Sequence, residues 1–271
     1  MIRDLSITEV TRPQASSISA SQHLIDLIVI LTQKEIKVRY KNSWLGYAWS
    51  VANPLLFALV YYIAFGLIMR TQIANYPLFL IAGLFPWQWI ANSMNGAPLI
   101  FLANAILIKR VRFPRYVLVV STVLNDGLHF VLSIPVIVAF LLLYGLAPSW
   151  MWLVGIPLLV VAQFMTACGL ALAIASLNLF FRDLDRLTSL LVTVLFFLTP
   201  IAYSGDMIPS EYRLLWFLNP VAPLIMSWQQ LFLGGKLDWL LLGISVINAG
   251  IAVGLGALIF AKLSPRFAEV V

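Results

Sequence analysis

Side chains capable of acid–base or metal chemistry are few in this sequence. The 271 residues include 11 aspartates and glutamates, one cysteine and two histidines. Of the carboxylates, only Asp126 falls inside a long apolar segment, so it has no partner for the paired-carboxyl chemistry of glycosidases. Two histidines cannot supply the ligand cluster that a metalloenzyme needs. We therefore expect no catalytic site and no metal site in this chain.

Asp126 and His129 form one candidate pair. They are three residues apart in "LNDGLHF", a spacing that places them on the same face of a helix. An ionisable residue in a membrane segment is a candidate for function, here in proton transfer or substrate binding. The alternative, which we favour, is that the two side chains satisfy each other at a contact between helices or subunits.

A phosphate-binding loop for ATP is also missing. The nearest approach, "LGGKLD" at 233–238, lacks the upstream glycine and the Ser or Thr that should follow the lysine. We therefore expect no cofactor in this chain. If ATP drives its activity, another chain must bind the ATP and Mg.

The composition places these residues in a membrane. Hydrophobic residues make up 62% and charged residues 10%, with a mean hydropathy of +0.96, whereas soluble domains carry about 25% charged residues. Because every backbone polar group must be satisfied within lipid, helices are the expected spans. The net charge of +6 is spread over short loops between apolar runs, which argues against nucleic-acid binding. The sequence thus predicts an all-α integral membrane protein.

Apolar runs of about 20 residues, enough to cross the hydrocarbon core, predict six transmembrane helices. The second run contains Pro86, Gly96 and Pro98, so we expect a kink or partial re-entry there. Tryptophans at the borders, Trp44, Trp87, Trp150 and Trp239, fit interfacial belts. The expected spans are 45–69, 76–107, 116–144, 150–180, 187–203 and 239–261.

The loops give the orientation, because cytoplasmic loops collect Lys and Arg. Both termini are expected in the cytoplasm, since the basic residues gather before span one, between spans two and three, between four and five, and after six. The opposite side holds Arg70, Arg213 and Lys236.

The regions outside the spans complete the expected organisation. Residues 1–21 are interpreted as a mobile cytoplasmic tail and 22–42 as an amphipathic helix on the cytoplasmic surface, because their apolar stretch is too short to cross. The transmembrane domain covers 43–262 and a C-terminal tail 263–271. Within the domain, 204–236 is too polar to span and is punctuated by proline and glycine, which predicts short re-entrant periplasmic helices.

Small residues predict where helices approach closely. Gly250 and Gly254 form a small-xxx-small pattern in "NAGIAVGLGAL", and "ACGLALAIAS" in span four is similar.

Five sequence segments carry a family likeness. The chain resembles the permease subunits of ATP-binding-cassette exporters of lipid-linked polysaccharides, and most closely the O-antigen export permeases, along nearly its whole length after the tail. The matching segments, in order, are "KEIKVRYKNSWLGYAWSVANPLL", "GLFPWQW", "LIKRVRFPR", "NLFFRDLDR" and "SPRFAEV".

This resemblance implies an ABC-2 type exporter fold in the bacterial inner membrane. The implied assembly is a homodimer of six-span subunits with a separate dimer of ABC ATPases, which bind ATP and Mg. The implied cargo is an undecaprenyl-diphosphate-linked polysaccharide, moved from the cytoplasm to the periplasm. The alternatives are a permease for another lipid-linked polymer, such as teichoic acid or capsule, and a membrane scaffold for glycosyltransferases that transports nothing.

The resemblance also assigns roles to cations and aromatic residues. The surface helix and the loop after span two would contact the ATPase, through Lys34, Glu35, Lys37, Lys109, Arg110, Arg112, Phe113, Pro114 and Arg115. The alternative is that these cations only set the topology and touch lipid headgroups. A diphosphate needs cations at the cytoplasmic entrance, for which we expect Arg39, Lys41, Arg182 and Arg186. Asp183 and Asp185 could instead pair with the last two.

Aromatic residues could line the passage for sugars, because sugar rings have apolar C–H faces. Phe57, Tyr61 and Phe65 recur every four residues in span one. Plain packing or lipid contact is the alternative reading of such a stripe. The candidates for the channel are Phe57, Tyr61, Tyr62, Phe65, Phe196, Phe197 and Tyr203, with the segment after Ser204 as a periplasmic gate.

Overall fold

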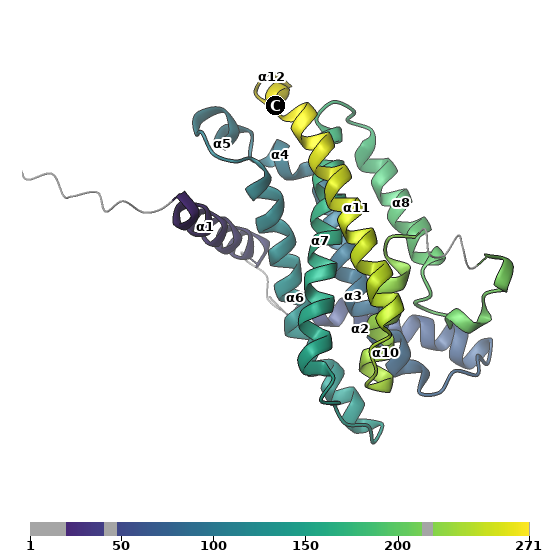
Figure 1. Cartoon of the computed structure of the whole chain (residues 1–271). Helices are drawn as coiled ribbons and strands as arrows, with labels where there is room; N and C mark the ends of the chain where they lie inside the picture. Colours follow the sequence, from purple (N-terminus) through teal and green to yellow (C-terminus); the bar gives the residue numbers. More distant parts are fainter. Residues whose placement is uncertain (1–19, 41–47, 213–218, 271) are drawn as a thin grey trace, which may run out of the picture.

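The computed structural model describes residues 20–40, 48–212 and 219–270, and within them the chain is helical with no strand. Three long helices, α6 (Tyr116–Leu143), α7 (Trp152–Asn178) and α11 (Trp239–Leu263), pack side by side (Figure 1). The predicted all-helical fold is therefore confirmed for the described residues.

Among the described residues, four segments are long and apolar enough to cross a membrane, and they coincide with predicted spans one, three, four and six. The first consists of α2 (Ala48–Tyr61) and a π-helical continuation, η1 (Tyr62–Ile68). The four candidate crossings are Val51–Ile68, Tyr116–Leu143, Trp152–Asn178 and Trp239–Arg266.

The predicted second span is broken into several helices. It contains α3 (Tyr76–Gly96), a 3-10 turn η2 (Ala97–Leu99), α4 (Ile100–Ala103) and α5 (Ala105–Arg110). The expected interruption occurs at Gly96 and Pro98, whereas α3 continues through Pro86. Most of α3 is buried among α2, α6, α7 and α8, so it is the central element of the bundle.

The predicted fifth span is shorter than expected. Helix α8 (Leu184–Leu198) has 15 residues, a length of about 22 Å at 1.5 Å per residue, which is less than the hydrocarbon thickness of about 30 Å. Thr199 is extended, so the helix ends there. Six crossings therefore stay a prediction.

The stretch 204–236 forms short helices, as predicted, but one of them is buried. The 3-10 turns η3 (Gly205–Met207) and η4 (Ser210–Tyr212) precede α10 (Ala222–Gly234). Helix α10 contacts α3, α7 and α11, and the Trp228 indole donates a 2.5 Å hydrogen bond to the Gln163 side chain of α7. Helix α10 is therefore packed into the bundle, with Ser227 and Gln229 among its buried residues, and its re-entrant, periplasmic character stays a prediction.

Helices α7 and α11 approach each other through Gly169 and Gly256. A Cβ atom added to Gly169 would lie 2.3 Å from the carbonyl carbon of Ala252, and one added to Gly256 would lie 2.3 Å from the Gly169 oxygen. By contrast, a Cβ atom at Gly250 or Gly254 would meet nothing within 4 Å. The small-residue pattern in span four is thus at a helix contact, whereas Gly250 and Gly254 make no close approach within the described chain.

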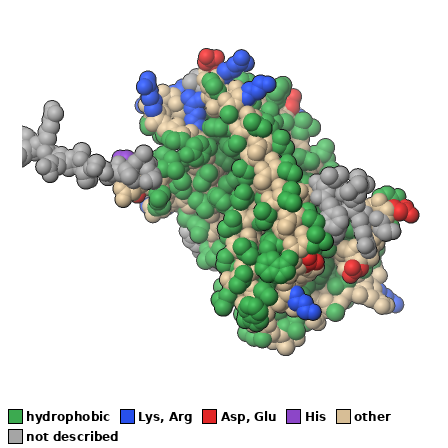
Figure 2. Space-filling view, viewed as in Figure 1, with side chains coloured by type: hydrophobic (Ala, Val, Ile, Leu, Met, Phe, Trp, Pro, Cys, Tyr) green, Lys and Arg blue, Asp and Glu red, His purple; other side chains and the backbone are tan. Residues whose placement is uncertain are grey.

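Helix α1 (Ala20–Tyr40) covers most of the predicted surface helix. It crosses α6 instead of running parallel to it (Figure 1), and Leu31 and Thr32 are its buried contacts. The chain ends in η5 (Ser264–Arg266) and α12 (Phe267–Val270). Figure 2 shows hydrophobic side chains over the long helices and Lys and Arg side chains gathered at the end that carries α5 and α12.

Candidate functional site

Aromatic rings from the first and fifth predicted spans meet against α3. The Tyr61 ring lies 5.3 Å from the Phe196 ring and 6.0 Å from the Phe65 ring, measured between centroids. The Trp87 ring of α3 meets Phe196 edge-on at 5.6 Å, and Phe197 does so at 5.4 Å. We call these five residues the aromatic cluster. The structure thus brings together residues that are more than 130 positions apart in sequence.

The cluster runs from a buried end to an exposed end. Trp87 is 4% exposed, whereas Phe197 is 63% exposed. The hydroxyl of Tyr203, another predicted residue, donates a 3.1 Å hydrogen bond to the Phe197 carbonyl. Of the other candidates, Tyr62 is half-buried at the start of η1, and Phe57 is exposed one turn earlier.

Trp87 was missed as a member of the cluster. We grouped it with the tryptophans expected at the membrane interface. Trp150 and Trp239 of that group are exposed, as an interfacial position requires. Trp87 is instead enclosed by the bundle. The available signal was its position within "GLFPWQW", a segment too apolar to separate lipid contact from core packing.

A hydrogen bond joins helix α1 to the segment after α3. The Lys34 ammonium donates to the Asn104 side-chain oxygen at 2.8 Å, and the Asn104 amide donates to the Ile100 carbonyl at 2.8 Å. The Glu35 carboxylate lies 3.9 Å from Lys34, and Lys37 is exposed. The predicted surface helix therefore contacts the chain at Asn104, five residues before the predicted ATPase-contact segment that starts at Lys109, and Asn104 was not among the predicted residues.

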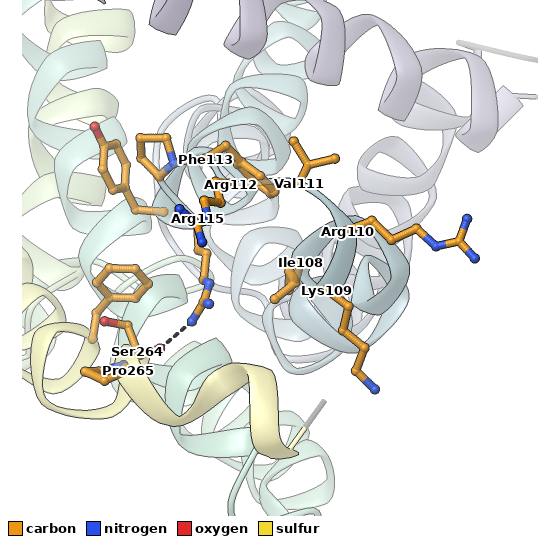
Figure 3. Close-up of a pocket in the computed structure, with 12 residues that line it drawn as sticks. Ile108, Lys109, Arg110, Val111, Arg112, Phe113, Arg115, Ser264 and Pro265 are labelled. Atoms are coloured by element: carbon orange, nitrogen blue, oxygen red, sulfur yellow. Dashed lines mark hydrogen bonds between the residues drawn. The ribbon is translucent and has the colours of Figure 1, made fainter.

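The loop after α5 surrounds a cavity of about 700 Å³, which we call the cationic cavity. Arg115 reaches from it toward the C-terminal segment (Figure 3): its guanidinium donates to the Ser264 carbonyl and lies 5.7 Å from the centre of the Phe267 ring. Lys109 and Arg110 extend away from Ser264 in the same view. The cavity is lined by residues 108–116 with Phe260, Ser264 and Pro265.

The predicted ATPase-contact residues around the cavity therefore differ in orientation. Lys109, Arg110, Arg112 and Pro114 are exposed and Phe113 is half-buried. Arg115 is half-buried because it binds the end of α11, where cations favour the carbonyl groups of a helix C-terminus. Arg115 thus connects the loop to the C-terminal segment, and its contact with an ATPase stays a prediction.

The predicted diphosphate entrance is described in part. Arg182 and Arg186 are exposed where α7 leads into α8, and neither forms a salt bridge with a carboxylate in the described ranges. The expected alternative, pairing with Asp183 or Asp185, is therefore not observed. Lys41 and the Arg39 side chain lie outside the described residues.

Asp126 and His129 lie at the contact of α3 and α6. Their exposed fractions are 1% and 7%. The Ser93 hydroxyl of α3 donates to the Asp126 carboxylate at 2.9 Å, and the Trp89 indole donates to the Val123 carbonyl at 3.1 Å. This position agrees with the interpretation of a polar contact between helices.

Across the described part of the chain, no three His, Cys, Asp or Glu side chains are grouped as a metal would require. That the chain is not an enzyme stays a prediction.

The long apolar helices of the described residues are those of a multi-pass membrane protein, and comparison with protein families gives its class. The family of ABC-2 type transporters matches residues 26–233. The chain belongs to this family.

Individual relatives show which members of the family this chain is similar to. The chain is 49% identical over 248 residues to the O-antigen export system permease protein RfbA of Klebsiella pneumoniae, covering 92% of this chain and 96% of the relative. It is 38% identical over 208 residues to the RfbA of Myxococcus xanthus, covering 76% and 80%. A more distant relative, 24% identical over 200 residues, is the polysialic acid transport protein KpsM of Escherichia coli, covering 71% and 75%. The predicted likeness to O-antigen export permeases is confirmed.

Proposed function

We propose that this chain is the transmembrane subunit of an ATP-driven exporter of O-antigen polysaccharide. The polysaccharide, linked to undecaprenyl diphosphate, passes from the cytoplasm to the periplasm through a channel at a homodimer interface. The observation that carries the proposal is the 49% identity to an O-antigen export permease across 92% of the chain. Since the sequence lacks a phosphate-binding loop, a separate dimer of ABC ATPases hydrolyses the ATP.

The aromatic cluster supports a role in sugar passage. Sugar rings present apolar C–H faces and polar edges. Flat aromatic rings can therefore contact the C–H faces without forming hydrogen bonds to the hydroxyl groups. The cluster joins α2, α3 and α8 and is exposed at Phe197. Phe57, Tyr62 and Tyr203 extend the same surface in the proposed channel.

The first crossing supports the proposed homodimer. In its most apolar stretch 11% of the residues are buried within the described chain, against 22% in the α11 crossing, 39% in α6 and 44% in α7. A helix with so little intrachain contact has a large face left for lipid or for a second subunit. Because the aromatic cluster begins on this helix, a dimer formed there would enclose the rings.

The cationic end supports the proposed ATPase contact and orientation. The hydrogen bond between Lys34 and Asn104 holds α1 beside the α4–α5 segment, and Lys37, Lys109 and Arg110 are free to meet an acidic partner surface. Since cytoplasmic loops collect Lys and Arg, this end faces the cytoplasm in the proposal. Arg39, Lys41, Arg182 and Arg186 then bind the carrier diphosphate.

The test is complementation of a deletion strain. Expression of the intact chain should restore surface O-antigen, detected on gels of lipopolysaccharide, and the chain should copurify with its coexpressed ATPase. Without the chain, lipid-linked O-antigen should accumulate in the cytoplasm. Copurification failure, or unchanged surface O-antigen after deletion, would refute the proposal.

A second candidate function is export of another lipid-linked polymer, such as teichoic acid or a capsule. The similarity to the polysialic acid transport protein favours considering it. The glycan that accumulates in the deletion strain distinguishes the two: a capsular or teichoic polymer there, with normal O-antigen, selects the second candidate.

A further inference from the structure

An apolar groove lies next to the cationic cavity, on the outer face of the helix bundle. The groove has a volume of about 240 Å³, and it shares Tyr116 and Phe260 with the cavity. Its position beside α6, α7 and α11 places it along the membrane-crossing part of the chain. We call it the apolar groove; it is lined by Tyr116, Val119, Val120, Cys168, Gly169, Leu172, Val253, Ala257 and Phe260.

The cationic cavity suits a negatively charged group, and the apolar groove beside it suits a hydrocarbon chain. Four cations, Lys109, Arg110, Arg112 and Arg115, line the cavity, and none of the described residues that line it is acidic. No charged residue lines the described part of the groove. A ligand that fits both must carry a negative group beside a hydrocarbon chain, which is the chemistry of an anionic phospholipid.

We propose that these adjoining pockets bind one anionic phospholipid, with its phosphate between Arg112 and Arg115 and one acyl chain passing Tyr116 and Phe260 into the apolar groove. Arginine is suited to phosphate because its planar guanidinium has five N–H donors. The bond from Arg115 to the Ser264 carbonyl and the Phe267 ring orient this side chain while leaving other donors for the ligand. Arg112 is exposed within the cavity lining.

The lipid site is separate from the proposed channel. The aromatic cluster lies on α2, η1, α3 and α8, whereas the groove lies on α6, α7 and α11. Lys109 and Arg110 extend away from Ser264 (Figure 3), so they remain available to a partner protein while the lipid is bound. The inference therefore goes beyond polysaccharide export and does not depend on it.

The experiment measures lipid binding to the purified chain, without ATPase, by native mass spectrometry. We expect one phosphatidylglycerol to bind at least fivefold more tightly than phosphatidylcholine. Arg112→Ala should weaken phosphatidylglycerol binding about fivefold, since one cation near a membrane surface contributes a factor of that order. The matched control is Lys236→Ala, which removes an exposed cation outside the cavity and the groove and should bind phosphatidylglycerol normally.

A second pair of variants tests the groove. Ala257 is exposed on α11, so Ala257→Phe should fill the groove and reduce binding without unfolding the protein, as a thermal unfolding curve will check. Ala139→Phe, at an exposed position on α6 outside the groove, should have no effect.

Three results would overturn the proposal. Equal binding of phosphatidylglycerol and phosphatidylcholine would refute the role of charge. Competition by glycerol phosphate as strong as that by the intact lipid would refute the role of the groove. Displacement of the lipid, one for one, by a polyprenyl diphosphate would assign the site to the transported carrier instead.

Discussion

Replacing Gly169 by alanine should destabilise the protein, because its Cα faces the backbone of α11. The added Cβ atom would lie 2.3 Å from the Ala252 carbonyl carbon and 2.5 Å from the Ala252 oxygen. Carbon atoms in favourable contact are about 3.5–4.0 Å apart, so the two helices must separate by roughly 1 Å. A side chain could rotate away from such a clash, but a helix backbone cannot.

The expected loss in the free energy of unfolding follows from measured effects of overpacking, about 1–3 kcal/mol for an added methyl group in a tight core. For a chain of this size, the midpoint of thermal unfolding should fall by roughly 2–10 °C. The midpoint is measured from tryptophan fluorescence, for which the chain has 9 tryptophans, in one detergent and at one heating rate. The heating rate is fixed because membrane proteins often unfold irreversibly.

Gly250→Ala on α11 is the matched control. Nothing lies within 4 Å of a Cβ atom at Gly250, and alanine is favoured over glycine in a helix by up to about 1 kcal/mol. Its unfolding midpoint should therefore stay the same or rise. Equal midpoints for Gly169→Ala and Gly250→Ala would refute the close approach of α7 and α11.

Three further variants test the proposed function and the fold. Tyr61→Ala should lower surface O-antigen at least fivefold while the ATPase still copurifies, because the ring that contacts Phe196 is lost; Val60→Ala, an exposed neighbour, should export normally, and normal export by Tyr61→Ala would contradict the channel. Lys37→Glu should reduce the ATPase recovered by affinity purification several-fold; full recovery would place the contact elsewhere. Gln163→Leu leaves the indole N–H of Trp228 without its acceptor, at a cost of about 1–3 kcal/mol for each unpaired group, so the thermal midpoint should fall, and an unchanged midpoint would contradict the hydrogen bond.

The four long apolar helices could be predicted because membrane thickness sets their length and lipid excludes charge. The limits of α3 could not be predicted, and the end of α8 was missed. Helix α3 is enclosed by other helices, and hydropathy does not separate burial in lipid from burial in protein. Helix α8 ends at Thr199 because Pro200 disfavours the helical conformation of the residue before it, a signal that the apolar run as far as Tyr203 outweighed.

In the candidate sites, too, the sequence predicts features within one helix but not the contacts between helices. The spacing of Tyr61 and Phe65 on one helix is visible in the sequence, but their meeting with Phe196 and Trp87 depends on how helices pack. Likewise, sequence shows which positions are glycine but not the rotation of each helix about its axis. Gly256 faces α7 whereas Gly254, two residues earlier, does not; a turn of about 100° per residue separates a helix contact from an open surface.

The anchoring of α10 divides the predicted periplasmic gate into a fixed part and a part that could open. The Trp152 indole donates to the Leu231 carbonyl at 2.9 Å, and the Gln229 amide donates to the Pro200 carbonyl at 3.1 Å, in addition to the bond between Trp228 and Gln163. The hydrogen bonds described for η3 and η4 stay within their own segment. If the outer mouth widens for a sugar chain, we therefore expect residues 204–212 to move while α10 stays fixed to the bundle.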